Sequence, residues 1–436
     1  MALYALLHRG ARGLVQSSMT ADFDCDALVI GAGPAGSATA ILLAQAGWQV
    51  VLVEQHGYPR RKVCGECIGA GNLALLDRLG LGPAFAAEAG PELERLGWMD
   101  AKTTLSADMP RCTQGRHPFG RALGRERLDS LLLDRAVSLG VTIMQPARVL
   151  EVGCDLAGFA CRVTSQSARR THTLRMPVVV DAHGSWERGP VRIGAGKSDQ
   201  EASAHRRRRN GDLLAFKANF RGARLDSGYL PVLALRGAYG GLVVADRGRL
   251  TLACCIRRDR LTALRRARPY ATAGDAVEEF LRSSSSGVRD ALDGAEREGT
   301  WLAVGPLRPG IRLGAVRGPF LVGNAAGECH PLIGEGISMA LQSAAMLGEL
   351  LIRRPPREIV GQHAVDLHRA YTAAWRRRFT PRLRLAAIFA HIAMRPALAR
   401  AARGFLALRP ALLGNAARLA GKAAGGTHPM SIAEHV

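Results

Sequence analysis

Residues 27–36, Ala-Leu-Val-Ile-Gly-Ala-Gly-Pro-Ala-Gly, pass from an apolar strand into a glycine-rich turn. A helix of small residues is expected over residues 37–46, and Gly47 ends it. A second apolar strand, residues 50–53, then leads to Glu54. The order strand, glycine turn, helix, strand and acid is typical of a dinucleotide-binding βαβ unit. We favour this interpretation over an ordinary βαβ turn.

The glycines of this unit have separate expected tasks. Gly31 makes the tight turn, Gly33 lets the backbone approach a pyrophosphate, and Gly36 lets the helix pack on the strand. The helix start offers free N–H groups and partial positive charge to phosphates. A carboxylate at the end of the second strand accepts from a ribose hydroxyl, which favours FAD or NAD over NADP. The expected cofactor contacts here are Gly31, Gly33, Pro34, Ala35, Gly36, Glu54 and Gln55.

Composition bounds the class of protein. The 436 residues suit two interleaved domains, and the hydrophobic content of 47% excludes a disordered chain. The sequence contains no uninterrupted apolar run of about 18 residues, so it predicts no membrane-spanning helix. The nine cysteines are scattered and odd in number, which suits a reducing cytoplasm. We therefore expect a cytoplasmic protein.

The net charge of +22 is concentrated near the C-terminus. Residues 353–422 contain fifteen Lys or Arg and two acids, a net of +13. The last 80 residues are expected to be helical, with breaks at Pro381, Pro396 and Pro410. Two interpretations stay open: basic helices whose apolar side contacts the inner face of a membrane, or a helical cap that packs its apolar side on the body.

The first residues of the chain have no acid before Asp22 and mix Leu with Arg and His. They fit a short targeting segment or surface anchor. The alternative is that Met19 is the true start, because the following residues lead straight into the first strand. We treat residues 1–21 as an N-terminal extension.

A second glycine-rich stretch lies about 290 residues further on. A strand over residues 319–322 ends in Gly323-Asn324, and a loop with Pro331 follows. Gly334-Glu335-Gly336 then opens a helix with Ile337 that runs to about Leu351. The start of that helix carries partial positive charge. Its glycines leave backbone bare, so a ligand could lie close to it.

Residues 60–67, Arg-Arg-Lys-Val-Cys-Gly-Glu-Cys, follow the first unit. The Arg and Lys residues suit phosphates or the acidic edge of a flavin. Cys64 and Cys67 form a C-x-x-C, which fits a redox dithiol, half a zinc site, or an active-site wall with Cys64 near the flavin. Zinc would need two more ligands, and the sequence has no second pair at suitable spacing. No metal site is expected.

Strand patterns fill much of the remaining chain. Residues 141–144, 148–152 and 161–164 predict a small antiparallel sheet, and residues 178–181 predict a buried strand that returns to the nucleotide domain. Alternating segments within residues 213–256 predict a second, antiparallel sheet. The basic run 205–209 fits a solvated loop. Because no aromatic residues interleave with it, we expect no nucleic-acid partner.

The two glycine-rich motifs and the Lys-x-Cys-Gly stretch resemble FAD enzymes of the geranylgeranyl reductase group, within the para-hydroxybenzoate hydroxylase superfamily. In that group the stretch lies along the flavin and lines the substrate cavity, which makes Lys62 and Cys64 cofactor contacts and candidate catalytic residues. Gly65 completes the match. The resemblance also implies that Arg125 or Arg127 reaches the FAD phosphates or ribityl chain.

Two positions depart from the superfamily pattern. Asn324 stands where members have an Asp that binds a ribityl hydroxyl, and an amide still forms that hydrogen bond. His183-Gly184 replaces an Asp-Gly pair that helps to dock the nicotinamide cofactor. That departure argues against direct use of NADPH by the hydroxylase route. The remaining implied flavin contacts are Gly323, Asn324, Gly334, Glu335, Gly336 and Ile337.

The resemblance implies an α/β fold: a Rossmann-type FAD-binding domain of the glutathione reductase and para-hydroxybenzoate hydroxylase type, with an inserted antiparallel substrate domain and a C-terminal helical segment. The expected divisions are residues 22–75, 111–192 and 300–352 for the FAD-binding domain, 76–110 and 193–299 for the substrate domain, and 353–436 for the basic helices.

The leading functional hypothesis is a FAD-dependent reductase of carbon–carbon double bonds in a lipophilic, isoprenoid or polyketide-like substrate. The second is a flavin monooxygenase that hydroxylates an aromatic or polyketide substrate. A third, of another class, is an electron-transfer flavoprotein with a protein electron donor. NADPH or NADH is a candidate donor in each enzyme hypothesis. A halogenase is disfavoured, because the chain has no Trp-x-Trp-x-Ile-Pro stretch.

Overall fold

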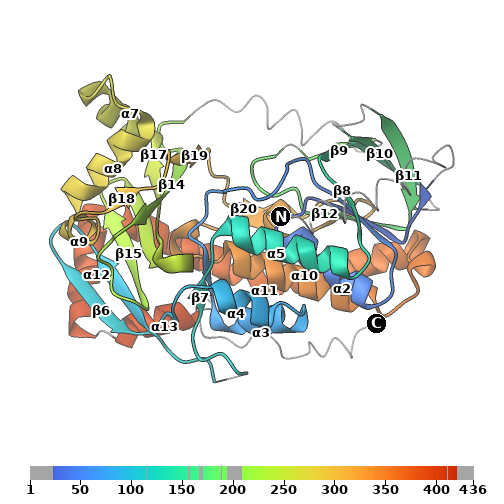
Figure 1. The fold of residues 1–436 in the computed structure, drawn as a ribbon, viewed down its shortest axis with the longest axis horizontal. Coiled ribbons are helices and arrows are strands. Elements are labelled where there is room, and N and C mark those ends of the chain that lie inside the picture. Colours follow the sequence, from blue (N-terminus) through green and yellow to red (C-terminus); the bar gives the residue numbers. More distant parts are fainter. Residues whose placement is uncertain are drawn as a thin grey trace.

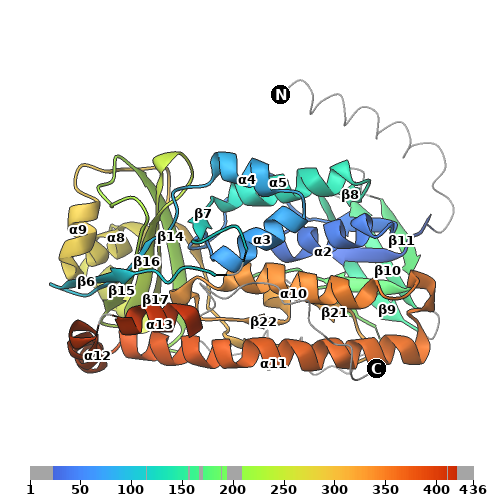
Figure 2. The ribbon, with the colours of Figure 1, turned by 90° about the horizontal axis from the view of Figure 1, so that it is seen from below.

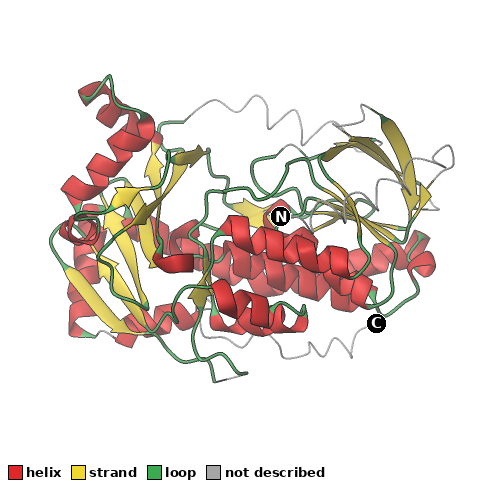
Figure 3. Cartoon of the chain, in the orientation of Figure 1, coloured by secondary structure: helices red, strands yellow, loops and turns green. Residues whose placement is uncertain are grey.

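A computed structural model describes most of the chain, namely residues 23–113, 115–155, 158–165, 170–187, 189–193, 209–409 and 411–419. The N-terminal extension, residues 1–21, and the basic residues 205–208 lie outside the described residues. Helices line up along the middle of the molecule, between two groups of strands (Figure 3).

A five-stranded parallel sheet forms the centre of the FAD-binding domain. Its strands are wholly buried where they are longest, as expected for a parallel sheet that is covered on both faces. The order is β21 (Phe320–Leu321), β12 (Val178–Asp181), β2 (Ala27–Ile30), β3 (Val50–Val53) and β8 (Thr142–Met144). The return of residues 178–181 to the nucleotide domain is therefore confirmed.

Three helices pack together beside this sheet: α2 (Pro34–Gln45), α5 (Arg125–Ser138) and α10 (Gly336–Leu351). In Figure 1 they run side by side through the middle of the molecule. Helix α10 begins where the second glycine-rich stretch ends, as the sequence predicted. Their apolar side chains and those of the sheet form one continuous core.

A second sheet lies at the far end of the parallel one. It contains β1 (Phe23–Asp24), β11 (Thr171–Met176), β10 (Phe159–Ser165), β9 (Ala147–Cys154) and β13 (Val191–Arg192). Residues 141–144 were expected to join it, and that prediction was wrong. They follow the crossover helix α5, which returns the chain parallel to β3, so β8 extends the parallel sheet.

The large sheet of the substrate domain carries eight strands. They are β18 (Glu296–Arg297), β14 (Leu213–Arg221), β17 (Leu250–Arg257), β16 (Ala238–Val244), β15 (Tyr229–Leu235), β5 (Arg95–Met99) and β6 (Thr104–Asp108), with β19 (Leu302–Val304) on β14. All pairs are antiparallel except β15 with β5. At the left of Figure 1 its outer side is covered by α7 (Arg258–Ala267), α8 (Ala273–Ser284) and α9 (Ser286–Ala291).

The domain divisions differ in detail from those drawn on the sequence. Strand β19 belongs to the large sheet, although it falls within the expected FAD-binding segment 300–352. Helices α3 (Ala70–Arg78) and α4 (Gly82–Glu88) pack on the core of the FAD-binding domain, although the substrate domain was drawn from residue 76. Strand β19 therefore belongs to the domain whose sheet it pairs with, and α3 and α4 belong to the domain whose core they contact. Neither assignment follows from their positions in the sequence.

The C-terminal segment contains three helices: α11 (Gly361–Ala393), α12 (Pro396–Leu408) and α13 (Ala411–Leu419). Figure 2 shows α11 along the underside of the molecule, beneath α10. The expected break at Pro381 is wrong, because α11 continues through it. An internal proline costs about 3 kcal/mol, and the burial of Trp375, Phe379 and Leu383 around it offsets that cost.

Proline does mark the next boundary, since Pro396 stands at the start of α12. Pro410 lies outside the described residues. Among the helices that the structure describes, none is both long and apolar enough to cross a membrane by itself; α11 and α12 reach that standard only as a pair, which is bent by 105°.

Candidate active site

A cavity of about 820 Å³ lies between the two domains and the C-terminal helices. One end is bordered by the carboxyl ends of the parallel strands and by residues 60–67. Strands β15, β16 and β17 form a wall, and α11, α12 and α13 close the other end. In an open α/β sheet, ligands bind at the carboxyl ends of the strands. We call the first region the flavin end and the second the C-terminal end.

Two kinds of glycine occur at the flavin end. A Cβ at Gly36 would lie 1.8 Å from the Gly31 carbonyl oxygen, so the βαβ turn itself requires that glycine. A Cβ at Gly33 would meet only an Arg125 nitrogen, at 3.7 Å, and one at Gly336 would meet nothing within 4 Å. Both face the cavity. Gly33 and Gly336 therefore leave backbone bare toward a ligand, as the sequence predicted.

Glu54 lies at the end of β3 and is buried. Its Oε2 accepts from the Ala32 N–H at 2.8 Å, and its Oε1 accepts from the His56 N–H at 2.9 Å. The carboxylate thus ties the second strand to the glycine turn. Glu54 and the adjacent Gln55 also line the cavity, where remaining lone pairs are available to a ribose hydroxyl.

The second glycine-rich stretch reaches the same end of the cavity, because β21 and β2 both flank β12. Gly323 donates its N–H to the Ser343 hydroxyl at 2.9 Å, and Asn324 donates from its amide to the Ser185 hydroxyl at 2.7 Å. Gly334 has a left-handed backbone conformation with φ of 62°. Glu335 and Ile337 are both buried. Glu335 faces Arg382 of α11 at 3.3 Å.

Of Arg125 and Arg127, it is Arg125, at the start of α5, that lines the cavity. It donates to both carboxylate oxygens of buried Asp129, at 2.8 and 2.7 Å. Arg127 instead pairs with Glu88, at 2.6 and 2.5 Å. The structure therefore separates two residues that the sequence left as alternatives.

Lys62 makes no hydrogen bond or ion pair with any residue that the structure describes, although it lines the cavity. Burial and the nearby Arg125 guanidinium lower the pKa of its ammonium group. An unpaired, partly desolvated cation favours an anionic ligand. Lys62, Arg125 and the start of α2 thus form a positive region next to Gly33.

Cys64 is half-buried in the cavity wall, and its sulfur accepts from the Glu66 N–H at 3.3 Å. Cys67 is buried in the short strand β4 (Cys67–Ile68), and neither cysteine forms a disulfide. In the described part of the chain, no three His, Cys, Asp or Glu side chains gather as a metal site would require. The arrangement gives Cys64 the position of a wall residue.

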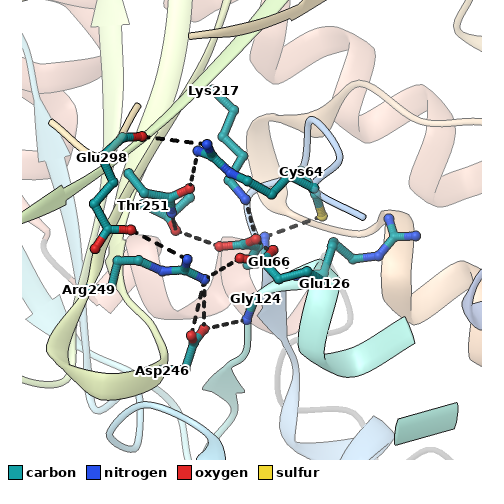
Figure 4. A network of polar contacts seen from close by, with 12 residues as sticks. Cys64, Glu66, Gly124, Glu126, Lys217, Asp246, Arg249, Thr251 and Glu298 are labelled. Atoms are coloured by element: carbon teal, nitrogen blue, oxygen red, sulfur yellow. Dashed lines mark hydrogen bonds and ion pairs between the residues drawn. The ribbon is translucent and has the colours of Figure 1, made fainter. Parts of the chain in front are cut away.

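A buried polar network, missed by the sequence analysis, lies directly behind Cys64 (Figure 4). Glu66 is fully buried and adopts a positive φ of 59°. Its carboxylate forms an ion pair with fully buried Lys217 of β14 and accepts from the Thr251 hydroxyl of β17 at 2.5 Å. It also accepts from the Arg125 N–H at 3.0 Å. One side chain thus joins the 60–67 loop, helix α5 and the large sheet.

The network continues on both sides of Glu66. Asn219 donates to the Thr251 hydroxyl at 2.8 Å and accepts from Arg61 at 2.8 Å. Arg249 pairs with three acids, and the Gly124 N–H donates to one of them, Asp246, at 2.7 Å. The acids are Glu126 at 2.8 Å, Asp246 at 3.1 Å and Glu298 at 3.6 Å. The network fixes the FAD-binding domain against the large sheet.

A second polar group interrupts the apolar wall beside the flavin end. The Tyr239 hydroxyl on β16 lies 3.0 Å from Nδ1 of half-buried His330, which directly precedes the cavity-lining Pro331. Burial, together with the neighbouring Cys255, Cys329 and Glu328, raises the pKa of Tyr239. Burial lowers the pKa of His330. Near neutral pH the pair therefore consists of a protonated tyrosine and a neutral imidazole.

The His183-Gly184 pair also faces this end of the cavity. Nδ1 of His183 lies 2.6 Å from the buried Asp181 carboxylate, and Arg192 lies 3.7 Å from it. Although burial opposes ionisation, these two partners lower the pKa of Asp181. The His183 imidazole is thus fixed by Asp181, at the end of β12.

These residues fit FAD. The bare backbone at Gly33 and Gly336, the unpaired Lys62 beside the α2 start, and Glu54 match the needs of a pyrophosphate, a ring system and a ribose. A family model described as "FAD binding domain" matches residues 24–382. The chain belongs to this family. The resemblance to the para-hydroxybenzoate hydroxylase superfamily and the expected fold class are confirmed.

The FAD-binding protein has relatives with several activities. The menaquinone reductase of Mycobacterium tuberculosis is 26% identical over 348 residues, which cover 77% of this chain and 78% of the relative. Two solved structures share the fold. A flavin-dependent brominase, Bmp2, in a triple-mutant form, has a TM-score of 0.70 at 18% identity and covers 94% and 97% of the two chains.

The second solved structure is a geranylgeranyl bacteriochlorophyll reductase-like protein of Thermoplasma acidophilum, with a TM-score of 0.65 at 15% identity. The match covers 93% of this chain and 94% of that one. Family and relatives together establish the protein as a flavin-dependent oxidoreductase.

Proposed function

We propose that the protein reduces carbon–carbon double bonds in a lipophilic substrate of isoprenoid or polyketide-like chemistry. The observation that carries the proposal is the cavity, whose apolar wall continues from the flavin end to the C-terminal helices. A volume of about 820 Å³ admits a long apolar molecule beside a ring system. The relative named menaquinone reductase acts on a lipid-soluble molecule, which supports the substrate class.

Reduced FAD, when bound, supplies a hydride from N5. Saturation of a double bond also requires a proton on the second carbon, so a side chain must hold that proton at the cavity wall. Lys62 borders the positive region and suits the cofactor. Cys64 borders the flavin end, and its sulfur is engaged by the Glu66 N–H.

We propose Tyr239 as the proton donor. Its raised pKa keeps the hydroxyl protonated near neutral pH, and it lies in the otherwise apolar wall formed by β16. The His330 imidazole contacts that hydroxyl and is itself half-buried, so it joins Tyr239 to the outside of the wall. After the hydroxyl proton is transferred to carbon, the Nδ1–H of His330 gives its proton to the Tyr239 oxygen while Nε2 takes a proton from solvent, so the imidazole stays neutral.

A monooxygenase is the second candidate, because the fold is shared with halogenases and hydroxylases and the cavity also admits an aromatic molecule. Oxygen separates the two: a reductase converts substrate without oxygen and a monooxygenase does not. An electron-transfer flavoprotein is the candidate of another class. Substrate consumption without a protein partner would rule it out.

The electron donor is tested first. The purified protein is mixed with NADPH or NADH without oxygen, and the flavin absorption is followed. Bleaching identifies a direct nicotinamide donor, whereas persistent absorption indicates a protein donor or reduction that awaits substrate. We expect persistent absorption, because His183 stands in the place of the Asp that helps to dock the nicotinamide cofactor and is paired with Asp181.

The reaction is then tested with chemically reduced protein and a polyprenylated naphthoquinone, with products analysed by mass spectrometry. We expect a mass gain of two hydrogens without oxygen. Oxygen incorporation as the only reaction would replace the reductase proposal with the monooxygenase. A colourless protein that FAD cannot reconstitute would contradict the cofactor assignment.

A further inference from the structure

We propose that helices α12 and α13 dock on an anionic lipid bilayer and that the C-terminal end of the cavity opens into it. The substrate would then pass from the membrane into the cavity without crossing water. The delivery step rests on the proposed lipophilic substrate, whereas the docking step is independent of it.

Apolar side chains of α12 remain exposed. The exposed fractions are 41% for Leu398, 60% for Phe405 and 82% for Leu408. By contrast, α11 buries Tyr371 and Trp375 completely or nearly so. The two interpretations of the basic helices thus apply to different helices: α11 is the cap, and α12 presents an apolar side to the outside.

The same surface is positively charged. Arg395, Arg400, Arg409 and Arg418 are all exposed on or beside α12 and α13. Residues 367–433 contain no acid in the sequence that would offset them. Exposed Phe and Leu next to Arg are typical of helices that lie in the interface of an anionic membrane. This charge selects a bilayer with anionic lipids as the partner.

The exposed surface is continuous with the cavity. Phe405 lines the cavity although it is largely exposed, and its neighbours Ala402 and Leu406 line it as well. Leu412 and Leu413 of α13 line the same cavity. An apolar mouth that meets the proposed membrane surface gives a hydrophobic molecule a direct path to β16 and Tyr239.

Arg403 fixes the orientation of α12. It donates to Asp100 at 3.2 Å and to the Thr103 hydroxyl at 3.1 Å, in the turn between β5 and β6. Figure 2 shows α12 and α13 at the end of the molecule where the large sheet lies. The docking surface is therefore attached to the substrate domain. Its position relative to the C-terminal end of the cavity is fixed by these contacts.

The test is flotation of the full-length holoprotein with vesicles. Phosphatidylcholine vesicles and vesicles rich in phosphatidylglycerol are compared at low and high salt. We expect binding to the anionic vesicles only, and release by high salt. The variant Leu398→Ser/Leu408→Ser should bind at least about tenfold less, and Arg400→Gln/Arg409→Gln should show a similar loss at low salt.

Val137→Ser is the matched control, because Val137 is an exposed apolar residue, at 47%, on the distant helix α5. Equal binding by the control and the Leu398→Ser/Leu408→Ser variant would overturn the proposal. Binding that resists high salt and carbonate would also overturn it, because the α11–α12 pair would then be inserted. Flavin content shows that each variant is folded.

Turnover separates docking from the proposed reaction. The Leu398→Ser/Leu408→Ser variant changes two exposed side chains that do not line the cavity. It should reduce a detergent-dispersed polyprenylated naphthoquinone at the wild-type rate and lose at least about tenfold with the same molecule in anionic vesicles. If wild type floats with vesicles but reduces neither form, the proposed reaction fails and docking stands. Equal loss in detergent and in vesicles would contradict the delivery step.

Discussion

The flavin end of the cavity combines bare backbone at two glycines with charged side chains, whereas the C-terminal end is lined by apolar side chains. At the flavin end, Gly33 and Gly336 expose bare peptide groups, and the positions of those groups are fixed by the parallel sheet. At the C-terminal end, Phe405 and Leu406 stand on a helix with few buried residues. A substitution at the flavin end should therefore block the binding of a ligand, whereas a substitution at the C-terminal end should change the access of substrate to the cavity.

The largest effect is expected from valine at two glycines of one turn. Gly36→Val places its Cβ against the Gly31 carbonyl, so the turn cannot form and the protein should fail to fold. Gly33→Val points into open cavity. It should keep the thermal midpoint of the apoprotein within a few degrees and weaken FAD binding by at least about tenfold, or about 1.4 kcal/mol.

Calorimetry of apoprotein and the flavin absorption of purified samples check this pair. A Gly33→Val protein that retains FAD would contradict the assignment of this turn to the pyrophosphate. A Gly36→Val protein with normal stability would show that the backbone contact relaxes.

The flavin end also depends on the buried ion pair behind it. Lys217→Met leaves the Glu66 carboxylate buried without its cation, which typically costs about 3–5 kcal/mol of the unfolding free energy. The matched control lies on the same strand: Arg221→Met removes the ion pair between a largely exposed guanidinium and Glu298 and should cost about 0–1 kcal/mol.

Urea unfolding of both variants measures the difference. Glu66→Gln/Lys217→Met should recover a large part of the loss, because no buried charge is left unpaired. If Lys217→Met and Arg221→Met cost the same, the pair is not shielded from water as its burial implies.

The two ends also differ in how far the sequence predicts them. The glycine turn and Glu54 lie within one βαβ unit, so local order predicted their positions. Glu66 meets Lys217 across 151 residues and Thr251 across 185, and no local pattern contains such a pair. The available signal was Lys217 and Asn219, two polar residues on one face of a strand that is otherwise apolar up to its last residue, Arg221.

Packing explains what else the sequence could not predict. Proline chemistry alone predicts a break at Pro381, but the burial of Trp375 and Phe379 keeps α11 continuous. Helices α11 and α12 have similar Arg-rich, apolar sequences and opposite surroundings. Only the position of the core shows that one is covered and the other is exposed.

Tyr239 tests whether the side-chain wall supplies chemistry as well as shape. Tyr239→Phe removes the hydroxyl and should slow substrate reduction by about 10²–10⁴-fold, the usual contribution of a positioned acid. FAD content should not change. Tyr229→Phe on the adjacent strand β15 is the control, because that hydroxyl is buried without a partner among the described residues. Equal rates in both variants would remove Tyr239 from the mechanism.

The pH profile of the same reaction gives a finer measurement. Because the pKa of Tyr239 is raised, its hydroxyl stays protonated at pH values above the ordinary pKa of about 10. Because the pKa of His330 is lowered, its imidazole is already neutral at the ordinary histidine pKa of about 6.5. The rate should therefore be level between about pH 6.5 and about pH 9.5. An alkaline fall that begins near pH 8 and is absent in Tyr239→Phe would show a hydroxyl that ionises too early.

The smallest effect is expected at Cys64, which lies in the cavity wall at the flavin end. Its sulfur accepts one weak hydrogen bond, and Glu66 is held by three stronger partners. Cys64→Ala should therefore leave the turn in place and change the rate by less than about threefold, or about 0.6 kcal/mol. Cys67→Ala, a buried position, is the control for packing alone. If Cys64→Ala instead loses more than about 100-fold while Tyr239→Phe is active, the proton comes from the flavin side of the cavity.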